Sequence, residues 1–94
     1  MSADEVSEFS TLKSRRTEII CREVDGRLVG LDLRSSHYFS LNPNGTLLWR
    51  LLEEGTTADD LVKALIAQNS LSTPAATADV ETFLASLHEQ HLLE

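Results

Sequence analysis

The amino-acid sequence predicts an α+β fold, in which a three-stranded antiparallel sheet is followed by three helices. Residues 17–41 are rich in strand-forming side chains and contain Asp25-Gly26, a strong signal for a two-residue hairpin turn. Asn42-Pro43 then supplies a capping side chain and a proline suited to the first position of a helix. Beyond this pair, apolar residues recur at helical spacing. With 94 residues, the chain has room for one domain with a modest core.

The strands follow from the alternation of apolar side chains. The first run begins at Ile19 and ends before the hairpin turn. The second, residues 28–33, has Val29, Leu31 and Leu33 on one face. After a polar turn, the third strand comprises His37, Tyr38, Phe39, Ser40 and Leu41, with Phe39 and Leu41 on one face and Tyr38 and Ser40 on the other.

Each predicted helix has a start signal and an apolar stripe. The first helix stops at Gly55, and the second is capped by Thr57. The third begins with the pair Thr73-Pro74, as cap and first-turn proline, and runs to about His91. The stripes are, in turn, Leu47, Leu48, Trp49, Leu51 and Leu52; Leu61, Val62, Leu65 and Ile66; and Ala76, Val80, Phe83, Leu84 and Leu87.

Charge is distributed unevenly along this chain of net charge −7. Residues 1–34 are nearly balanced, whereas residues 35–94 are mostly acidic and hold no Lys or Arg after Lys63. The helical half should therefore repel phosphate backbones, which disfavours nucleic acid as a partner. Residues 1–15 have no sustained period and predict a flexible N-terminal arm, so that the folded domain comprises residues 16–94.

The sequence predicts no catalytic site. Cys21 lies in an apolar strand without a His nearby in sequence, which indicates a buried and inert thiol. His88 and His91 lack the further ligands that a metal site needs, and no glycine-rich phosphate loop is present. We therefore expect neither enzyme activity, nor a metal, nor another cofactor. No apolar run is long enough to span a membrane, and a single cysteine fits a reducing cytoplasm.

Three kinds of binding function remain open from the residues alone. If the third strand lies at a sheet edge, its unpaired backbone groups can accept an extended peptide. Phe83 lies at the margin of its stripe beside Asp79, a position suited either to a groove wall or to the periphery of the core. The second function is a winged-helix DNA-binding transcriptional regulator, which the acidic third helix disfavours. The third is a structural or dimerisation module.

A series of short segments gives the sequence a family resemblance. These segments are Leu31-Asp32-Leu33, then Tyr38-Phe39-Ser40-Leu41-Asn42-Pro43-Asn44-Gly45, Leu48-Trp49, Gly55-Thr56-Thr57 leading to Leu61, Asp79-Val80, Phe83-Leu84 with Leu87, and Leu92-Leu93. In their order and spacing they resemble the PqqD-like family over about residues 17–94. The small free-standing form is most similar to the stand-alone leader-binding proteins of lasso-peptide biosynthesis.

The resemblance implies a leader-recognition domain (a RiPP recognition element) with a winged-helix-like fold. In such a domain, the leader of a ribosomally made precursor peptide adds as a strand to the third strand and lies against the third helix. The implied peptide-binding residues are His37, Tyr38, Phe39, Ser40, Leu41, Asp79, Val80, Phe83, Leu84 and Leu87. The implied partners are the leader peptide, a leader peptidase of the cysteine-protease type and a cyclase, and pairing of two copies as a homodimer is left open.

Overall fold

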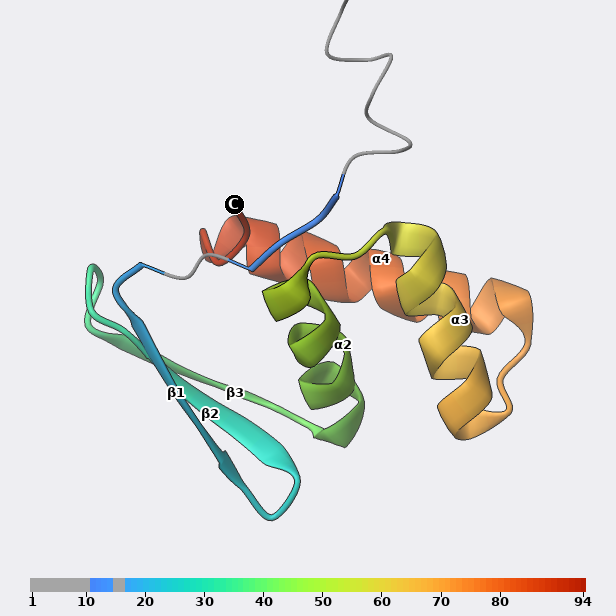
Figure 1. Cartoon of the computed structure of the whole chain (residues 1–94), viewed down its shortest axis with the longest axis horizontal. Coiled ribbons are helices and arrows are strands. Elements are labelled where there is room, and N and C mark those ends of the chain that lie inside the picture. The colour runs from blue at the N-terminus through green and yellow to red at the C-terminus, as the bar shows by residue number, and fades with distance from the viewer. Residues whose placement is uncertain (1–10, 15–16) are drawn as a thin grey trace, which may run out of the picture.

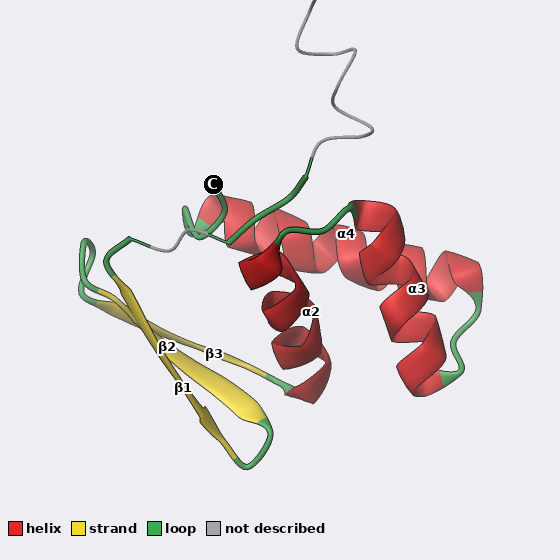
Figure 2. Ribbon diagram, viewed as in Figure 1, coloured by secondary structure: helices red, strands yellow, loops and turns green. Residues whose placement is uncertain are grey.

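The computed structural model describes residues 11–14 and 17–94 and confirms the predicted α+β fold. In chain order, the elements are β1 (Ile19–Val24), β2 (Arg27–Asp32), β3 (His37–Leu41), α2 (Pro43–Glu54), α3 (Ala58–Asn69) and α4 (Thr73–Glu89). The sheet forms one side of the molecule and the helices form the other, with α2 next to the sheet (Figure 1). Figure 2 shows the same division into a strand half and a helix half.

The sheet is antiparallel, with β2 between β1 and β3. The β1–β2 hairpin turns at Asp25 and Gly26, whose φ angles are 51° and 77°. Two consecutive positive φ angles characterise a type I′ turn, whose twist matches that of the flanking strands. The predicted third strand is confirmed at both ends, whereas the second begins and ends one residue earlier than predicted.

Only one face of the sheet packs against the helices. On β2, Leu28 and Asp32 are buried on this inner face, with Gly30 between them. Val29 is exposed, and so is Leu33 just beyond the strand. The face predicted to carry these two residues is therefore the outer face of the sheet.

Phe39 occupies the space above Gly30 on the inner face. A Cβ atom at Gly30 would lie 2.2 Å from Cζ of Phe39, so the ring can cross the strand only because this residue is glycine. The ring then meets Trp49 of α2, with the two ring centroids 5.5 Å apart and the ring planes tilted by 48°. Because Trp49 is 1% exposed, this aromatic contact docks the sheet onto α2 within the core.

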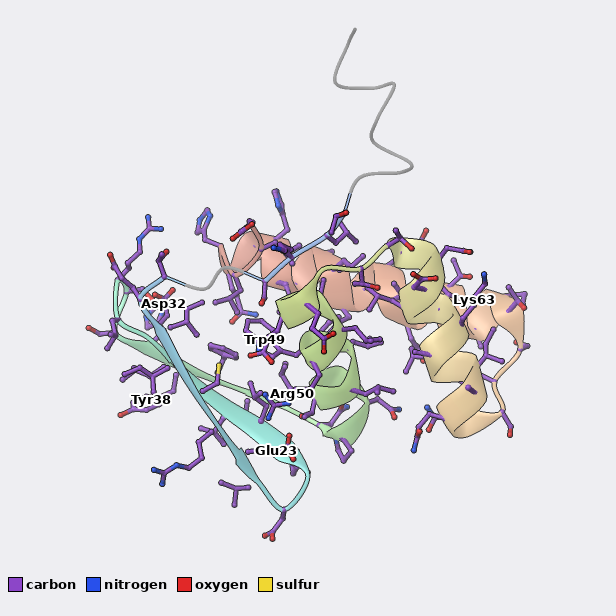
Figure 3. All side chains as sticks on the ribbon, in the orientation of Figure 1. Glu23, Asp32, Tyr38, Trp49, Arg50 and Lys63 are labelled. Carbon is purple, nitrogen blue, oxygen red and sulfur yellow. The ribbon has the colours of Figure 1, made fainter. Side chains whose placement is uncertain are left out.

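A buried hydroxyl also joins the sheet to α2. Thr46 accepts a hydrogen bond from the backbone N–H of Leu28 at 2.8 Å and donates one to the carbonyl of Leu41 at 3.4 Å. It thereby ties two strands to the first turn of one helix. At the surface, Arg50 of α2 forms an ion pair with Glu23 of β1 at 2.8 Å (Figure 3). This pair is solvent-exposed and contributes less than the buried contacts.

The starts of α2 and α3 follow the predicted capping signals. The side chain of Asn42 accepts a hydrogen bond from the backbone N–H of Gly45 at 2.7 Å, which caps α2 ahead of its N-terminal proline. Thr57 accepts one from the N–H of Asp60 at 3.2 Å and caps α3. Gly55, with φ of 100°, ends α2 as predicted.

The structure corrects both ends of the third predicted helix. The cap of α4 is Ser72, which accepts a hydrogen bond from the N–H of Ala75 at 3.3 Å, so Thr73 already lies within the helix. The helix ends at Glu89 rather than at His91. His91 adopts a left-handed φ of 58°, and the N–H of Leu92 donates to the carbonyl of Leu87 in a Schellman-type turn. This turn sends Leu92, 1% exposed, back into the core.

The predicted flexible arm is wrong for residues 11–14, while residues 1–10 and 15 lie outside the described residues. Leu12 and Thr56 exchange backbone hydrogen bonds, and the N–H of Ser14 donates to the carbonyl of Leu52 at 3.0 Å. The N–H of Glu94 donates to the backbone carbonyl of Lys13 at 2.9 Å. Ser14 is 1% exposed, because residues 11–14 pack between the α2–α3 connection and the C-terminal segment. These residues therefore belong to the folded domain.

The core lies between the three helices and the inner face of the sheet, and each predicted apolar stripe contributes to it. Its buried apolar residues are Leu28, Leu48, Trp49, Leu52, Leu61, Leu65, Ala76, Val80, Leu87 and Leu92.

We expect Gly30→Ala to lower the free energy of unfolding by about 1–3 kcal/mol, because the added methyl group would displace the Phe39 ring. Urea denaturation measures this loss. In a Phe39→Ala background the same substitution should cost much less, since the ring that it displaces is absent. An equal cost in both backgrounds would show that the Phe39 ring is not what restricts this position.

Candidate functional site

The outer edge of β3 has no partner strand in the part of the chain that the structure describes. β3 pairs with β2 alone, from Asp32 opposite His37 to Leu28 opposite Leu41. Along such an edge, backbone N–H and C=O groups point away from the sheet and can pair with an extended chain. β1 is also an edge, but the residues that line the two cavities described next do not come from β1. The first cavity includes the start of β3, and the second includes Asn42, which directly follows β3.

The first cavity lies between the start of β3 and the end of α4 and has a volume of about 460 Å³. It brings the half-buried ring of Phe39 together with ionisable side chains of both signs. One of these, Asp32, is 6% exposed and accepts a hydrogen bond from the N–H of Arg34 at 3.0 Å. The lining residues are Asp32, Arg34, Ser35, His37, Tyr38, Phe39, Glu89, Gln90, His91 and Leu92.

The second cavity lies at the other end of β3, between the start of α2 and the middle of α4, and has a volume of about 310 Å³. Its apolar lining includes the buried Leu48 and Leu65 and the half-buried Phe83. Its polar lining includes the carboxylate of Asp79. The complete lining is Asn42, Asn44, Gly45, Leu48, Leu65, Asp79, Thr82 and Phe83. This combination suits a side chain with an apolar body and a polar or cationic end.

Gly45 lets α4 come close to the end of β3. A Cβ atom at Gly45 would lie 3.2 Å from Cβ of Leu41 and 3.4 Å from Cε1 of Phe83. The first turn of α2 is therefore enclosed between the last residue of β3 and the ring of Phe83. As a result, the ring of Phe83 lies across Gly45 from Leu41, the last residue of β3.

All five site residues predicted on the third strand lie in β3. Phe39 and Leu41 are half-buried and pack against the core, which confirms the face predicted for them. His37 and Ser40 are exposed, and Tyr38 is 75% exposed. His37, Tyr38 and Phe39 line the first cavity, so the start of β3 forms one of its walls.

The predicted residues of the third helix divide into surface and core. Asp79 and Phe83 line the second cavity. Leu84 is half-buried against the core, whereas Val80 and Leu87 are each 1% exposed. A peptide at the surface would thus meet Asp79 and Phe83 first, with Val80 and Leu87 lying in the core behind them.

Several cavity residues were not identified from the sequence. Asp32 is one, although the turn after β2 could have placed it opposite His37. Asn42 is another. Its side chain was assigned the role of capping α2, and that role gave no reason to place it in a binding site. The sequence pattern did not predict that the segment from Glu89 to Leu92 lines a cavity. The position of this segment depends on the left-handed turn at His91.

Cys21 has the features of a structural thiol. It is half-buried on the inner face and packs against the core. Burial is the main cause that raises its pKa above the ordinary value of 9.0, the Glu53 carboxylate raises it further, and Arg50 opposes both. Within residues 11–14 and 17–94, no three His, Cys, Asp or Glu side chains are grouped to hold a metal ion. No helix of this described part is long and apolar enough to cross a bilayer.

Comparison with known proteins identifies similar sequences and structures. The family model for coenzyme PQQ synthesis protein D (PqqD) matches residues 27–93. The structure of TbiB1 in complex with the TbiA(beta) leader peptide is 33% identical, covers 87% of this chain and 94% of that chain, and has a TM-score of 0.79. The structure of lasso peptide synthetase B1 complexed with the leader peptide is 26% identical, covers 88% and 96%, and has a TM-score of 0.77. No curated protein matches significantly.

We expect the Cys21 thiol to react slowly with Ellman's reagent at pH 8. Its raised pKa leaves less thiolate in the folded protein than in the urea-unfolded chain at the same pH. The rate should increase as the pH rises through the folded-state pKa. The protonated thiol contributes to the free energy of unfolding below about pH 9, and this contribution is lost as the pH rises through the folded-state pKa. Glu53→Gln should speed the reaction, and equal rates in folded and unfolded protein would contradict this account.

Proposed function

The chain belongs to the PqqD family, and on that premise we propose that it is an adaptor for the leader segment of a ribosomally made precursor peptide. In this proposal, the leader adds as a further strand to the free edge of β3 and is presented to a modifying enzyme. The observation that carries the proposal is the open edge of β3 with a cavity at each end, both of them shared with α4 or the residues that follow it. The two similar solved structures are both complexes with leader peptides.

We derive the length of the bound leader segment from the length of β3. β3 has five residues, which corresponds to about 16 Å of extended chain. A leader segment of about five residues would therefore reach from one cavity to the other. Backbone pairing would provide affinity with little demand on sequence, and the cavities would select side chains at the two ends. Such a complex corresponds to about −8 to −12 kcal/mol of binding free energy, in the micromolar to nanomolar range.

The net charge of the chain and Asp79 of the second cavity favour a leader that carries basic residues, whereas the first cavity also contains Arg34 beside its acidic residues. Asp79 lines the second cavity, and Glu89 and the buried Asp32 line the first. The whole chain has a net charge of −7, so its field would attract a cationic segment during encounter. This attraction acts mainly on the association rate and weakens as salt is added.

The proposed site comprises His37–Leu41 together with Asp79 and Phe83. Leu84, Val80 and Leu87 support it from the side of the core. In our proposal the protein performs no catalysis itself and works in lasso-peptide biosynthesis, in the cytoplasm. It would pass the bound precursor to a leader peptidase of the cysteine-protease type, and the released core peptide would go on to a cyclase.

The alternative of a DNA-binding regulator is not favoured. α4 would be the recognition helix, yet its charged residues are Asp79, Glu81 and Glu89, and it carries no Lys or Arg. Each phosphate contact requires a cation, so this helix has the wrong sign of charge.

We expect the protein to bind the synthetic leader of a precursor peptide whose gene neighbours its own, and Phe83→Ala to weaken that binding by about tenfold. The loss follows from removing the aromatic wall of the second cavity. Fluorescence anisotropy of a labelled leader measures the dissociation constant.

Ile66→Ala is the matched control, because it truncates a half-buried apolar side chain of α3 that lines neither cavity. It should lower stability without changing the leader affinity. Failure of the wild-type protein to bind any such leader would refute the proposal, as would a homodimer in which two copies of β3 occupy each other's edge.

Methylation of the leader backbone tests the strand geometry directly. In an added strand, alternate N–H groups face β3 and the others face away. Leaders N-methylated at alternate residues should therefore bind at least about tenfold more weakly in one frame than in the other, as anisotropy would show. Similar losses in both frames would indicate that the leader does not bind as a β-strand.

A further inference from the structure

The exposed apolar side chains of this protein are concentrated on one surface. Among the described residues, every large apolar side chain classed as exposed lies in the sheet or in the turn after β2, and none lies on a helix. Ile20 is 57% exposed and Tyr38 is 75% exposed. The complete set is Ile20, Val24, Val29, Leu33 and Tyr38.

The pairing register places Ile20, Val24, Val29 and Tyr38 on the outer face of the sheet, and Leu33 directly follows β2. Ile20 of β1, Leu31 of β2 and Tyr38 of β3 are paired across the three strands, and residues paired in this way share one face. Figure 3 shows Tyr38 on the side of the sheet away from α2, and Trp49 on the side toward it. Each strand therefore contributes an apolar side chain to one row across a face that none of the described helices covers.

The charges on this face differ in sign from those of the helices. The charged strand residues that share it are Arg22 and Arg27, because Glu23 and Asp32 belong to the inner face. Neither arginine forms an ion pair with any described residue. The outer face is thus apolar and basic in a protein of net charge −7, and it is complementary to a surface that is apolar and acidic.

The size of the face is too small for a stable homodimer. Strands of five or six residues are about 20 Å long, and three of them span roughly 14 Å, which gives roughly 300 Å² of projected area. Stable complexes bury about 800 Å² on each partner. A second copy would also oppose arginines with arginines. The face therefore suits a transient partner with carboxylates rather than a second copy.

A membrane is the less favoured partner. Sites that bind anionic membranes usually combine about four to eight basic residues, and each adds about 1 kcal/mol. The outer face offers only Arg22 and Arg27 on its strands, and the net charge of −7 opposes an anionic surface.

We propose that the outer face of the sheet, centred on Ile20, Leu31 and Tyr38 with Arg22 and Arg27, docks the enzyme that acts on the peptide held at β3, through an apolar and acidic surface of that enzyme. This inference rests on the proposed function. A leader strand added beside β3 would continue the row of Ile20, Leu31 and Tyr38 by one side chain. An enzyme seated on this face would therefore contact the adaptor and the leader together.

The test uses the double variant Ile20→Ser/Arg22→Glu, which changes β1 and leaves the β3 site intact. Leader binding is first measured by anisotropy and should match that of the wild type. Biolayer interferometry then measures binding of each leader-loaded protein to the purified peptidase encoded beside the precursor. The double variant should bind the peptidase at least about tenfold more weakly, and added salt should weaken the wild-type complex.

Lys63→Glu is the matched control, because it makes the same change of charge on α3, where the lysine is 72% exposed. It should bind the peptidase within about twofold of the wild type, a difference of about 0.4 kcal/mol. Equal peptidase binding by the double variant and the wild type would overturn the inference while leaving leader binding, and so the proposed function, intact. Two other results would also overturn the inference. One is binding of the wild type, but not of the double variant, to phosphatidylserine vesicles. The other is dimerisation of the wild type, but not of the double variant, in sedimentation.

Discussion

The contact of Phe39 with Gly30 and Trp49 determines how the two halves of this domain fit together. The Phe39 ring can lie across β2 only because Gly30 has no side chain there. From this position the ring contacts the buried Trp49 of α2. This contact fixes which face of the sheet is inner and holds β3 directly against the helix that follows it. The hydroxyl of Thr46 reinforces the junction by bonding to the backbone of both β2 and β3.

β3 is anchored through its inner face and through its pairing with β2, which leaves its other edge unpaired among the described residues. Phe39 and Leu41 hold the strand, while its outer edge has no partner within residues 11–14 and 17–94. Rigid placement matters for binding by strand addition, since a preformed edge loses little conformational entropy when the peptide arrives. The same anchoring places the cavity residues of α4 and of the turn after it near the two ends of the strand.

The domain separates its charges in a way that suits two different partners. The helical half carries the excess of acidic residues, and Asp79 and Glu89 bring that excess to the cavities beside β3. The outer sheet face carries arginines and apolar side chains instead. In our proposals, the edge would hold a basic peptide and the outer face an acidic protein surface, and both could be occupied together because the edge and the outer face are different surfaces of the sheet.

The sequence by itself determined the features that depend on neighbouring residues, such as the Asp25-Gly26 turn, the bounds of β3 and the caps of α2 and α3. Local hydrogen bonds and backbone preferences are encoded within a few residues, so patterns reveal them. Only the tertiary structure decided that Val29 faces outward, that Ser14 is buried and that α4 stops at Glu89. Each of these depends on a distant partner: the Phe39 ring, the carbonyl of Leu52 and the core site that receives Leu92.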